Sequence, residues 1–185
     1  MHKLLGVCVV AISLCGYFTV PVAAQEGSSK QETAPANLIT RDRIGLNLDG
    51  AELILAGAKK KGAELKIAVN IAIVDNGGHL LAFARMDNAR PASVSTALTK
   101  AIAAATTRVP TGPVRTGDAE PNLLLNLSLQ NAAAAGGGKM TGLYGGVPIV
   151  VDGQVIGAVG VGGGTGEQDA EVAKAGIERL LEKLR

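Results

Sequence analysis

The sequence predicts an α+β domain in which packed α-helices cover an antiparallel β-sheet built from hairpins. Alternating apolar residues flank two turn signals, "NGG" and "DG", which predicts two β-hairpins. Apolar residues recur at helical spacing in three other stretches, which predicts amphipathic helices. Hairpins rather than helical crossovers join the strands, and this favours an antiparallel sheet with helices packed against it.

The first 24 residues have the anatomy of a secretory signal peptide. Lys3 supplies a positive charge, residues 4–20 are mostly apolar, and "VAA" before Gln25 is a small-residue cleavage site. A retained membrane anchor is the alternative, but Pro21 and the cleavage site favour removal. We therefore expect an exported protein, periplasmic or secreted, with no membrane span after cleavage of the signal peptide at 1–24.

Residues 25–44 are polar and contain proline, which predicts a disordered spacer ahead of one domain at 45–185. Both cysteines, Cys8 and Cys15, lie in the leader. The mature chain would then have no disulfide, no thiol catalysis and no cysteine-based metal site.

The formal charge of +2 is nearly balanced, so the composition gives no reason to expect a nucleic acid partner. Phe83 and Tyr144 are the only aromatic residues that follow the leader. Two aromatic side chains are too few for a base-stacking or sugar-stacking platform.

The first helix is expected to begin after Asn47, a residue type that favours N-caps, with apolar residues at 48, 51, 55 and 58 on one face. Residues 67, 69, 71 and 73 are apolar at period two and predict a strand with one strongly apolar face. After the "NGG" turn, the returning strand is "HLLAFARM".

The second half is expected to contain a helix, a loop, a second hairpin and a last helix. An Ala-rich stripe in "ASVSTALTKAIAAATTR" predicts a helix, and residues 109–121 read as a loop. We expect a short helix or irregular segment in "NLLLNLSLQN" and a strand within the flexible "GGGKMTGLYGG". The "DG" hairpin then leads to a last helix with a Thr165–Gln168 capping box.

The glycine-rich stretch "VGVGGGTGEQD" lies between a predicted strand and a predicted helix, which is the setting of a phosphate-binding loop. It lacks the G-x-G-x-x-G spacing, G-K-[ST] and the surrounding βαβ unit of such loops. We therefore interpret the glycines as a close passage of the chain past a neighbouring element. An anion held at that helix N-terminus stays open.

Common catalytic sets are missing from the sequence. A Ser-His-Asp triad would have to use His79, which sits at a hairpin turn, and no G-x-S-x-G elbow is present. A zinc site has no support from ligand spacing. Carboxylates at 75, 87, 152 and 169 are scattered, and no pair of them stands out.

Three stretches together carry a family resemblance: "IVDNGGHLLAFARMD", "TKAIAAA" and "GGVPIVVDGQVIGAVGVGGGTGEQDAEVAKAG". The chain resembles the GlcG/HbpS-like family, which includes the C-terminal domain of PduO proteins, over roughly residues 45–184. The resemblance implies a compact α+β domain, homo-oligomers, and binding of haem or a related tetrapyrrole in some members. It also implies, for exported members, haem sensing, storage or handling with a partner sensor histidine kinase.

Two other functions stay open. The family is sometimes described as haem-degrading, so the chain could be an enzyme acting on haem or on a small organic acid. It could also be an oligomeric scaffold whose pocket has lost its ligand. We expect a binding protein rather than an enzyme, and assign no catalytic residue.

Haem requires an apolar slot, cations for its propionates and usually an axial iron ligand. We place it near the loop after the second helix, where Arg108, Thr111 and Arg115 follow the Ala-rich stripe. His79 and Arg85 are further candidates; His79 shares strand parity with Leu81, which puts it at the rim of an apolar face. The iron ligand stays open among His79, Thr111, Met86, Met140 and Tyr144.

The leader gives the first testable prediction. N-terminal sequencing of the exported protein should find a chain beginning at Gln25, because signal peptidase cleaves after the small residues of "VAA". A mature cytoplasmic chain that still begins at Met1 would contradict the expectation of export.

Overall fold

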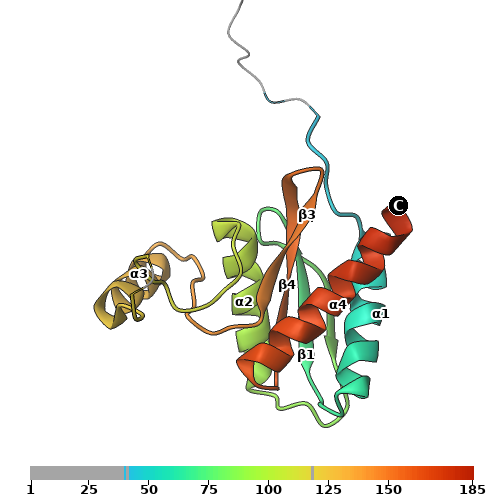
Figure 1. Cartoon of the computed structure of the whole chain (residues 1–185), viewed down its shortest axis with the longest axis horizontal. Coiled ribbons are helices and arrows are strands. Elements are labelled where there is room, and N and C mark those ends of the chain that lie inside the picture. Colours follow the sequence, from blue (N-terminus) through green and yellow to red (C-terminus); the bar gives the residue numbers. More distant parts are fainter. Residues whose placement is uncertain (1–39, 41, 118) are drawn as a thin grey trace, which may run out of the picture. The chain divides into compact units, whose positions relative to one another are not determined.

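The computed structural model describes residues 40, 42–117 and 119–185, so the predicted leader and most of the predicted spacer lie outside the described residues. Two pairs of consecutive strands stand between helices, as expected of an α+β domain built from hairpins (Figure 1). Their bounds are α1 (Leu48–Glu64), β1 (Asn70–Asp75), β2 (Leu80–Arg85), α2 (Ser93–Thr107), α3 (Leu123–Ala135), β3 (Gly146–Val151), β4 (Gln154–Gly162) and α4 (Gly166–Leu184).

The four strands form one antiparallel sheet in the order β2-β1-β4-β3. The predicted hairpins are β1–β2 and β3–β4, and they join through β1 and β4, where Ile71 pairs with Val161. The predicted fold class is therefore confirmed. The start of β1 lies beside the end of β4, and the loops of the candidate functional site adjoin this end of the sheet.

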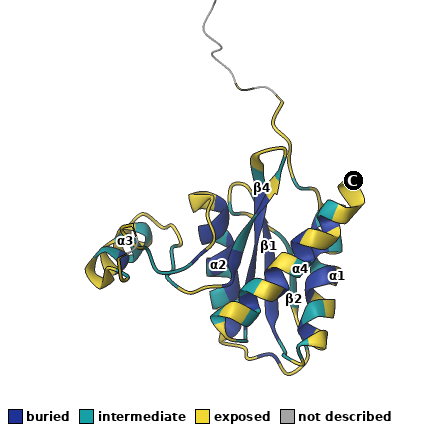
Figure 2. Cartoon of the chain, in the orientation of Figure 1, coloured by how far each residue is buried: buried dark blue, intermediate teal, exposed yellow. Residues whose placement is uncertain are grey.

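Helices cover both faces of the sheet (Figure 1). Ile71 and Ile73 of β1 pack in a core with residues of α1 and α4, whereas Ala72 and Val74 pack in a second core with α2. Figure 2 shows the central strands as the most buried part of this arrangement. The prediction of a single strongly apolar face for β1 was therefore too narrow, because alanine and valine serve the α2 face.

Helix α2 lies very close to β4. Its buried residues include Ala97, Ala101 and Ala104, whose small side chains allow a short separation between helix and sheet. At Gly160 of β4, a Cβ atom would collide with the backbone of α2 at Ala97 and Ala101. The glycines of "VGVGG" therefore allow a close approach of two backbones, as the sequence indicated.

Both predicted N-caps are confirmed. The Asn47 side chain accepts a hydrogen bond from Gly50 N at 2.9 Å and begins α1. At α4, the Thr165 side chain accepts from Gln168 N, and the Gln168 side chain accepts from Thr165 N, as a capping box requires.

Helix α3 and the segment after it differ from expectation. The "NLLLNLSLQN" stretch belongs to a helix of 13 residues that is held by loops rather than by the sheet: Asn126 bonds both backbone groups of Val114. No strand occurs at 136–145, and β3 begins at Gly146. None of the helices in the described part of the chain has the length and hydropathy of a membrane-spanning segment.

The α2–β4 approach predicts that Gly160→Ala is strongly destabilising. The added methyl group meets backbone atoms that cannot rotate away, so we expect a loss of about 3 kcal/mol in the free energy of unfolding, measured by urea denaturation. Gly45→Ala is the matched control, because nothing lies within 4 Å of its Cβ position, and its effect should stay within about 0.5 kcal/mol. Equal effects of the two variants would contradict this packing argument.

Candidate functional site

Two cavities lie side by side and share Tyr144 as a wall. The polar cavity, of about 350 Å³, lies between the start of α2 and the loop from β4 into α4. The apolar cavity, of about 460 Å³, lies between the end of α2 and the loops around α3. These two cavities are the candidate functional site.

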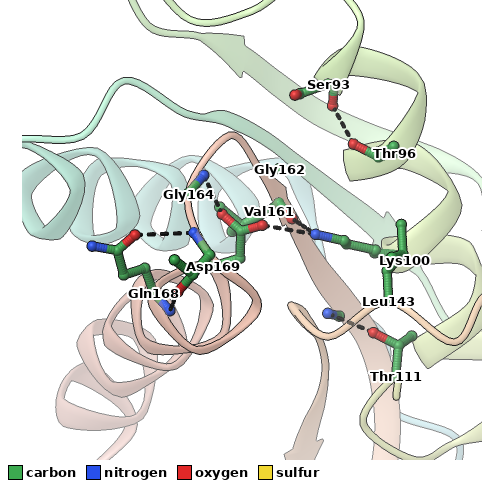
Figure 3. Close-up of polar contacts among 12 residues, drawn as sticks. Ser93, Thr96, Lys100, Thr111, Leu143, Val161, Gly162, Gly164, Gln168 and Asp169 are labelled. Atoms are coloured by element: carbon green, nitrogen blue, oxygen red, sulfur yellow. Dashed lines mark hydrogen bonds and ion pairs between the residues drawn. The ribbon is translucent and has the colours of Figure 1, made fainter. Parts of the chain in front are cut away.

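A buried ion pair forms the floor of the polar cavity (Figure 3). Lys100 Nζ of α2 donates to Asp169 Oδ2 and to Val161 O, both at 2.7 Å. The second carboxylate oxygen of Asp169 accepts from Gly164 N at 2.9 Å. The side chains of Lys100 and Asp169 are only 5% and 3% exposed, so the pair is almost fully removed from water.

The mouth of the polar cavity carries one side chain of each charge, Arg90 and Glu167. The backbone of the loop that bears Arg90 is held by the fully buried Asn70, whose Nδ2 donates to Arg90 O at 3.0 Å. The pKa of Glu167 is lowered from its ordinary value, because its own backbone N–H and the Thr165 hydroxyl stabilise the carboxylate more than burial opposes it.

The apolar cavity has an aliphatic lining with few polar groups. Asn126 of α3 holds its loop at Val114, through bonds of 2.8 and 2.9 Å to the backbone N–H and C=O. The apolar part of the lining consists of Ala103, Val109, Pro110, Gly112, Pro113, Val114 and Met140. The remaining lining residues are Thr107, Thr111, Arg115, Thr141 and Tyr144. This combination suits a ligand that is mainly apolar and carries a polar edge.

Tyr144 is held between two glycines. A Cβ atom at Gly112 would lie 2.6 Å from the Tyr144 ring, and one at Gly166 would lie 2.8 Å from the Tyr144 Cβ. Gly112 belongs to the loop after α2, and Gly166 is the first residue of α4. Larger residues at either position would displace the wall between the cavities.

The structure brings together Thr111 and Arg115 in the apolar cavity, with two of the other candidate iron ligands, Met140 and Tyr144. Thr111 is 7% exposed and pinned to the start of β3, because its hydroxyl accepts from Gly146 N at 2.8 Å and its N–H donates to Gly146 O. Arg115 is exposed, and its guanidinium lies 3.4 Å from Ala119 O and 3.9 Å from the Glu120 carboxylate.

His79 lines neither cavity and lies on the exposed β1–β2 turn. Its side chain is 82% exposed, and Nδ1 lies 3.2 Å from both carboxylate oxygens of Asp75. Burial raises the pKa of Asp75, but bonds from the backbone and side chain of His79 and from Gly77 N outweigh it, so the pKa lies below its ordinary value. The histidine thus has a structural partner in the turn.

The remaining candidates are dispersed. Arg85 ends β2 and donates from Nε to Ala89 O at 3.1 Å. Arg108 ends α2 in a left-handed conformation, φ 62°, and its side chain lines a separate hollow near the β3–β4 turn. Met86 packs against the core beneath α1. In the described ranges, no group of three or more His, Cys, Asp or Glu side chains is placed to hold a metal ion.

Sequence reasoning did not identify the Lys100–Asp169 pair. A signal for Lys100 was present, because it lies three residues after Ala97 and four before Ala104, on the buried stripe of α2. A lysine on an otherwise alanine stripe indicates a buried partner. No local pattern identifies Asp169 as that partner, because 69 residues separate the two.

The model of a family described as "Haem degrading protein HbpS-like" matches residues 46–178. Protein GlcG from Escherichia coli K12 is 41% identical over 121 residues, which cover 65% of this chain and 84% of GlcG.

Two solved structures share the fold. A crystal structure of a PduOC–haem complex has a TM-score of 0.62 and 28% identity, and covers 74% of this chain and 95% of PduOC. A double mutant of HbpS from Streptomyces reticuli has a TM-score of 0.60 and 26% identity, and covers 86% of this chain and 96% of HbpS.

Proposed function

The chain belongs to the HbpS-like family, and on this basis we propose that it binds haem or a related tetrapyrrole in the apolar cavity beside Tyr144. Support comes from the similar PduOC, which was crystallised with haem, and from the family description, which names haem. The observation that carries the proposal is the cavity itself, which combines a mainly aliphatic lining with an exposed arginine, Arg115, at its edge.

Arg115 is the residue that we assign to a haem propionate. Its guanidinium is exposed, and its contacts with described residues, to Ala119 O and to Glu120, are long, so it could turn toward a carboxylate at the edge of the cavity. Charge-assisted bonds of arginine to carboxylate are stronger than neutral hydrogen bonds. Arg108 leaves α2 one turn after Ala104 but lines another hollow, so we give it a smaller role.

Three side chains that could ligate iron line the apolar cavity: Thr111, Met140 and Tyr144. Of the other two candidates, His79 contacts the Asp75 carboxylate in the β1–β2 turn, and Met86 packs against the core. We therefore propose that any axial ligand comes from the loops at residues 111 and 140–144 rather than from the β1–β2 hairpin. Bound haem would supply iron-centred redox chemistry; the residues of this chain would bind and orient it.

We further propose that the protein acts outside the cytoplasm in haem sensing, storage or handling, and that a sensor kinase is a partner. Support comes from the signal-peptide anatomy of residues 1–24. The structural similarity to HbpS is a second support for this proposal.

We also propose a homo-oligomer in which a second copy packs on α3. Leu123, Leu124 and Leu127 are 81%, 74% and 53% exposed, and the sequence of α3 contains no charged residue. Exposed apolar patches of this kind are typical of interfaces between subunits. A second copy of the chain suits such a surface, because three exposed leucines lie within the first five residues of a helix that carries no charge.

Haem titration of three variants tests the binding site. Arg115→Ala should weaken binding by about 1.5–3 kcal/mol, because it removes a charge-assisted bond to a propionate. Arg108→Ala should have a smaller effect, and His79→Ala should bind as the unmodified chain does. The measurement is the Soret absorbance of the purified protein as haem is added.

A Soret band lost in His79→Ala but unchanged in Arg115→Ala would make the turn histidine the ligand and contradict the proposed site. Loss of the band on addition of a reductant would indicate turnover of haem rather than storage. Absence of any Soret change in the unmodified chain would contradict haem binding itself.

Light scattering tests the proposed oligomer. The unmodified protein should exceed the monomer mass at micromolar concentration, and the double variant Leu123→Gln with Leu127→Gln should return to the monomer mass. Leu184→Gln is the matched control, because Leu184 is an exposed leucine at the end of a different helix, α4. A monomeric unmodified protein, or a control as disruptive as the α3 variant, would refute an interface on α3.

A further inference from the structure

We propose that the polar cavity is a second binding site, separate from the haem site, for a small organic carboxylate that carries a further oxygen atom. The residues that would hold it are Arg90 at the mouth and Ser93 and Lys100 at the floor. The proposed haem function uses none of these residues.

The floor carries two donors that are not fully used. Ser93 is 6% exposed and lines the cavity. Its backbone O accepts from the Thr96 hydroxyl (Figure 3) and its backbone N donates to Arg90 O, whereas its hydroxyl has no hydrogen-bond partner within the described parts of the chain. Lys100 has three N–H groups, and two of them are bonded, to Val161 O and Asp169. Both groups line the cavity, so a ligand oxygen at the floor could accept from the Ser93 hydroxyl and from the third N–H of Lys100.

The mouth carries a free cation. Within the described ranges the guanidinium of Arg90 has no hydrogen bond or ion pair, while its backbone is fixed, because Arg90 O accepts from Asn70 Nδ2 and from Ser93 N. Arginine binds carboxylates in a bidentate geometry. A fixed backbone beneath a free guanidinium suits the capture of an anion from solvent.

The buried carboxylate of the polar cavity already has hydrogen-bond partners in the protein. Asp169 accepts from Lys100 and from Gly164 N through its two oxygens. Glu167 stands at the exposed mouth, where its own backbone and Thr165 stabilise its carboxylate. Free donors and occupied acceptors favour a ligand that brings acceptors, and hence an anion rather than an amine.

The depth of the cavity sets the second requirement. Arg90 is exposed, whereas Ser93 and Lys100 are buried, so one ligand group at the mouth cannot reach all three. A carboxylate on Arg90 and a second oxygen between Ser93 and Lys100 would satisfy every free donor. The cavity volume of about 350 Å³ suits a small organic acid. The proposed tetrapyrrole would lie in the other, apolar cavity.

Calorimetric titration of the purified protein with lactate and with propionate tests this site, because the two acids differ only by a hydroxyl group. We expect saturable lactate binding and several-fold weaker propionate binding. Arg90→Ala should weaken lactate binding about tenfold or more, and Ser93→Ala should weaken it several-fold. Arg43→Ala is the matched control, since Arg43 is an exposed arginine lining a different hollow, and it should bind lactate normally.

Each variant is also checked by its unfolding temperature without ligand and by its Soret titration. An unchanged Soret response in Arg90→Ala with lost lactate binding supports a site distinct from the haem site. No saturable binding of lactate, or equal binding in Arg90→Ala, Ser93→Ala and the unmodified protein, would overturn the proposal. Propionate binding as tightly as lactate would overturn the role of the second oxygen.

Discussion

The buried ion pair between Lys100 and Asp169 joins two helices that pack on opposite faces of the sheet. Lys100 comes from α2 on one face of the sheet, and Asp169 from the first turn of α4 on the other. Burying two charges is costly unless their remaining polar groups are bonded. Here Val161 O and Gly164 N supply those bonds, from the end of β4 and the loop after it. The geometry of the β4–α4 connection therefore depends on the pair.

That connection in turn positions both cavities. It fixes the start of α4, against which Tyr144 packs at Gly166, and Tyr144 forms the wall that the two cavities share. The loop after α2 meets the other side of Tyr144 at Gly112. A floor with a buried ion pair on one side and a mainly aliphatic lining on the other give one small domain two neighbouring cavities of different chemistry.

Local features of the fold could be predicted from the sequence. Turn residues fix the two hairpins, and the N-caps at Asn47 and Thr165 are confirmed because capping involves neighbouring residues only. The length of α3 was missed, because its leucines and alanines form no stripe that separates a buried face from an exposed one. The site was predicted only in part: Thr111 and Arg115 follow α2 directly, whereas Lys100, Asp169 and Tyr144 meet through long-range packing that leaves no local pattern.

A double-mutant cycle on the ion pair tests this account most directly. Lys100→Met and Asp169→Asn each leave a buried polar partner, so each should cost about 3–5 kcal/mol in the free energy of unfolding. The double variant removes both charges, and it should cost clearly less than the sum of the two single variants. Costs that add to within about 0.5 kcal/mol, or single variants that cost less than about 1 kcal/mol, would show that the fold does not depend on the pair.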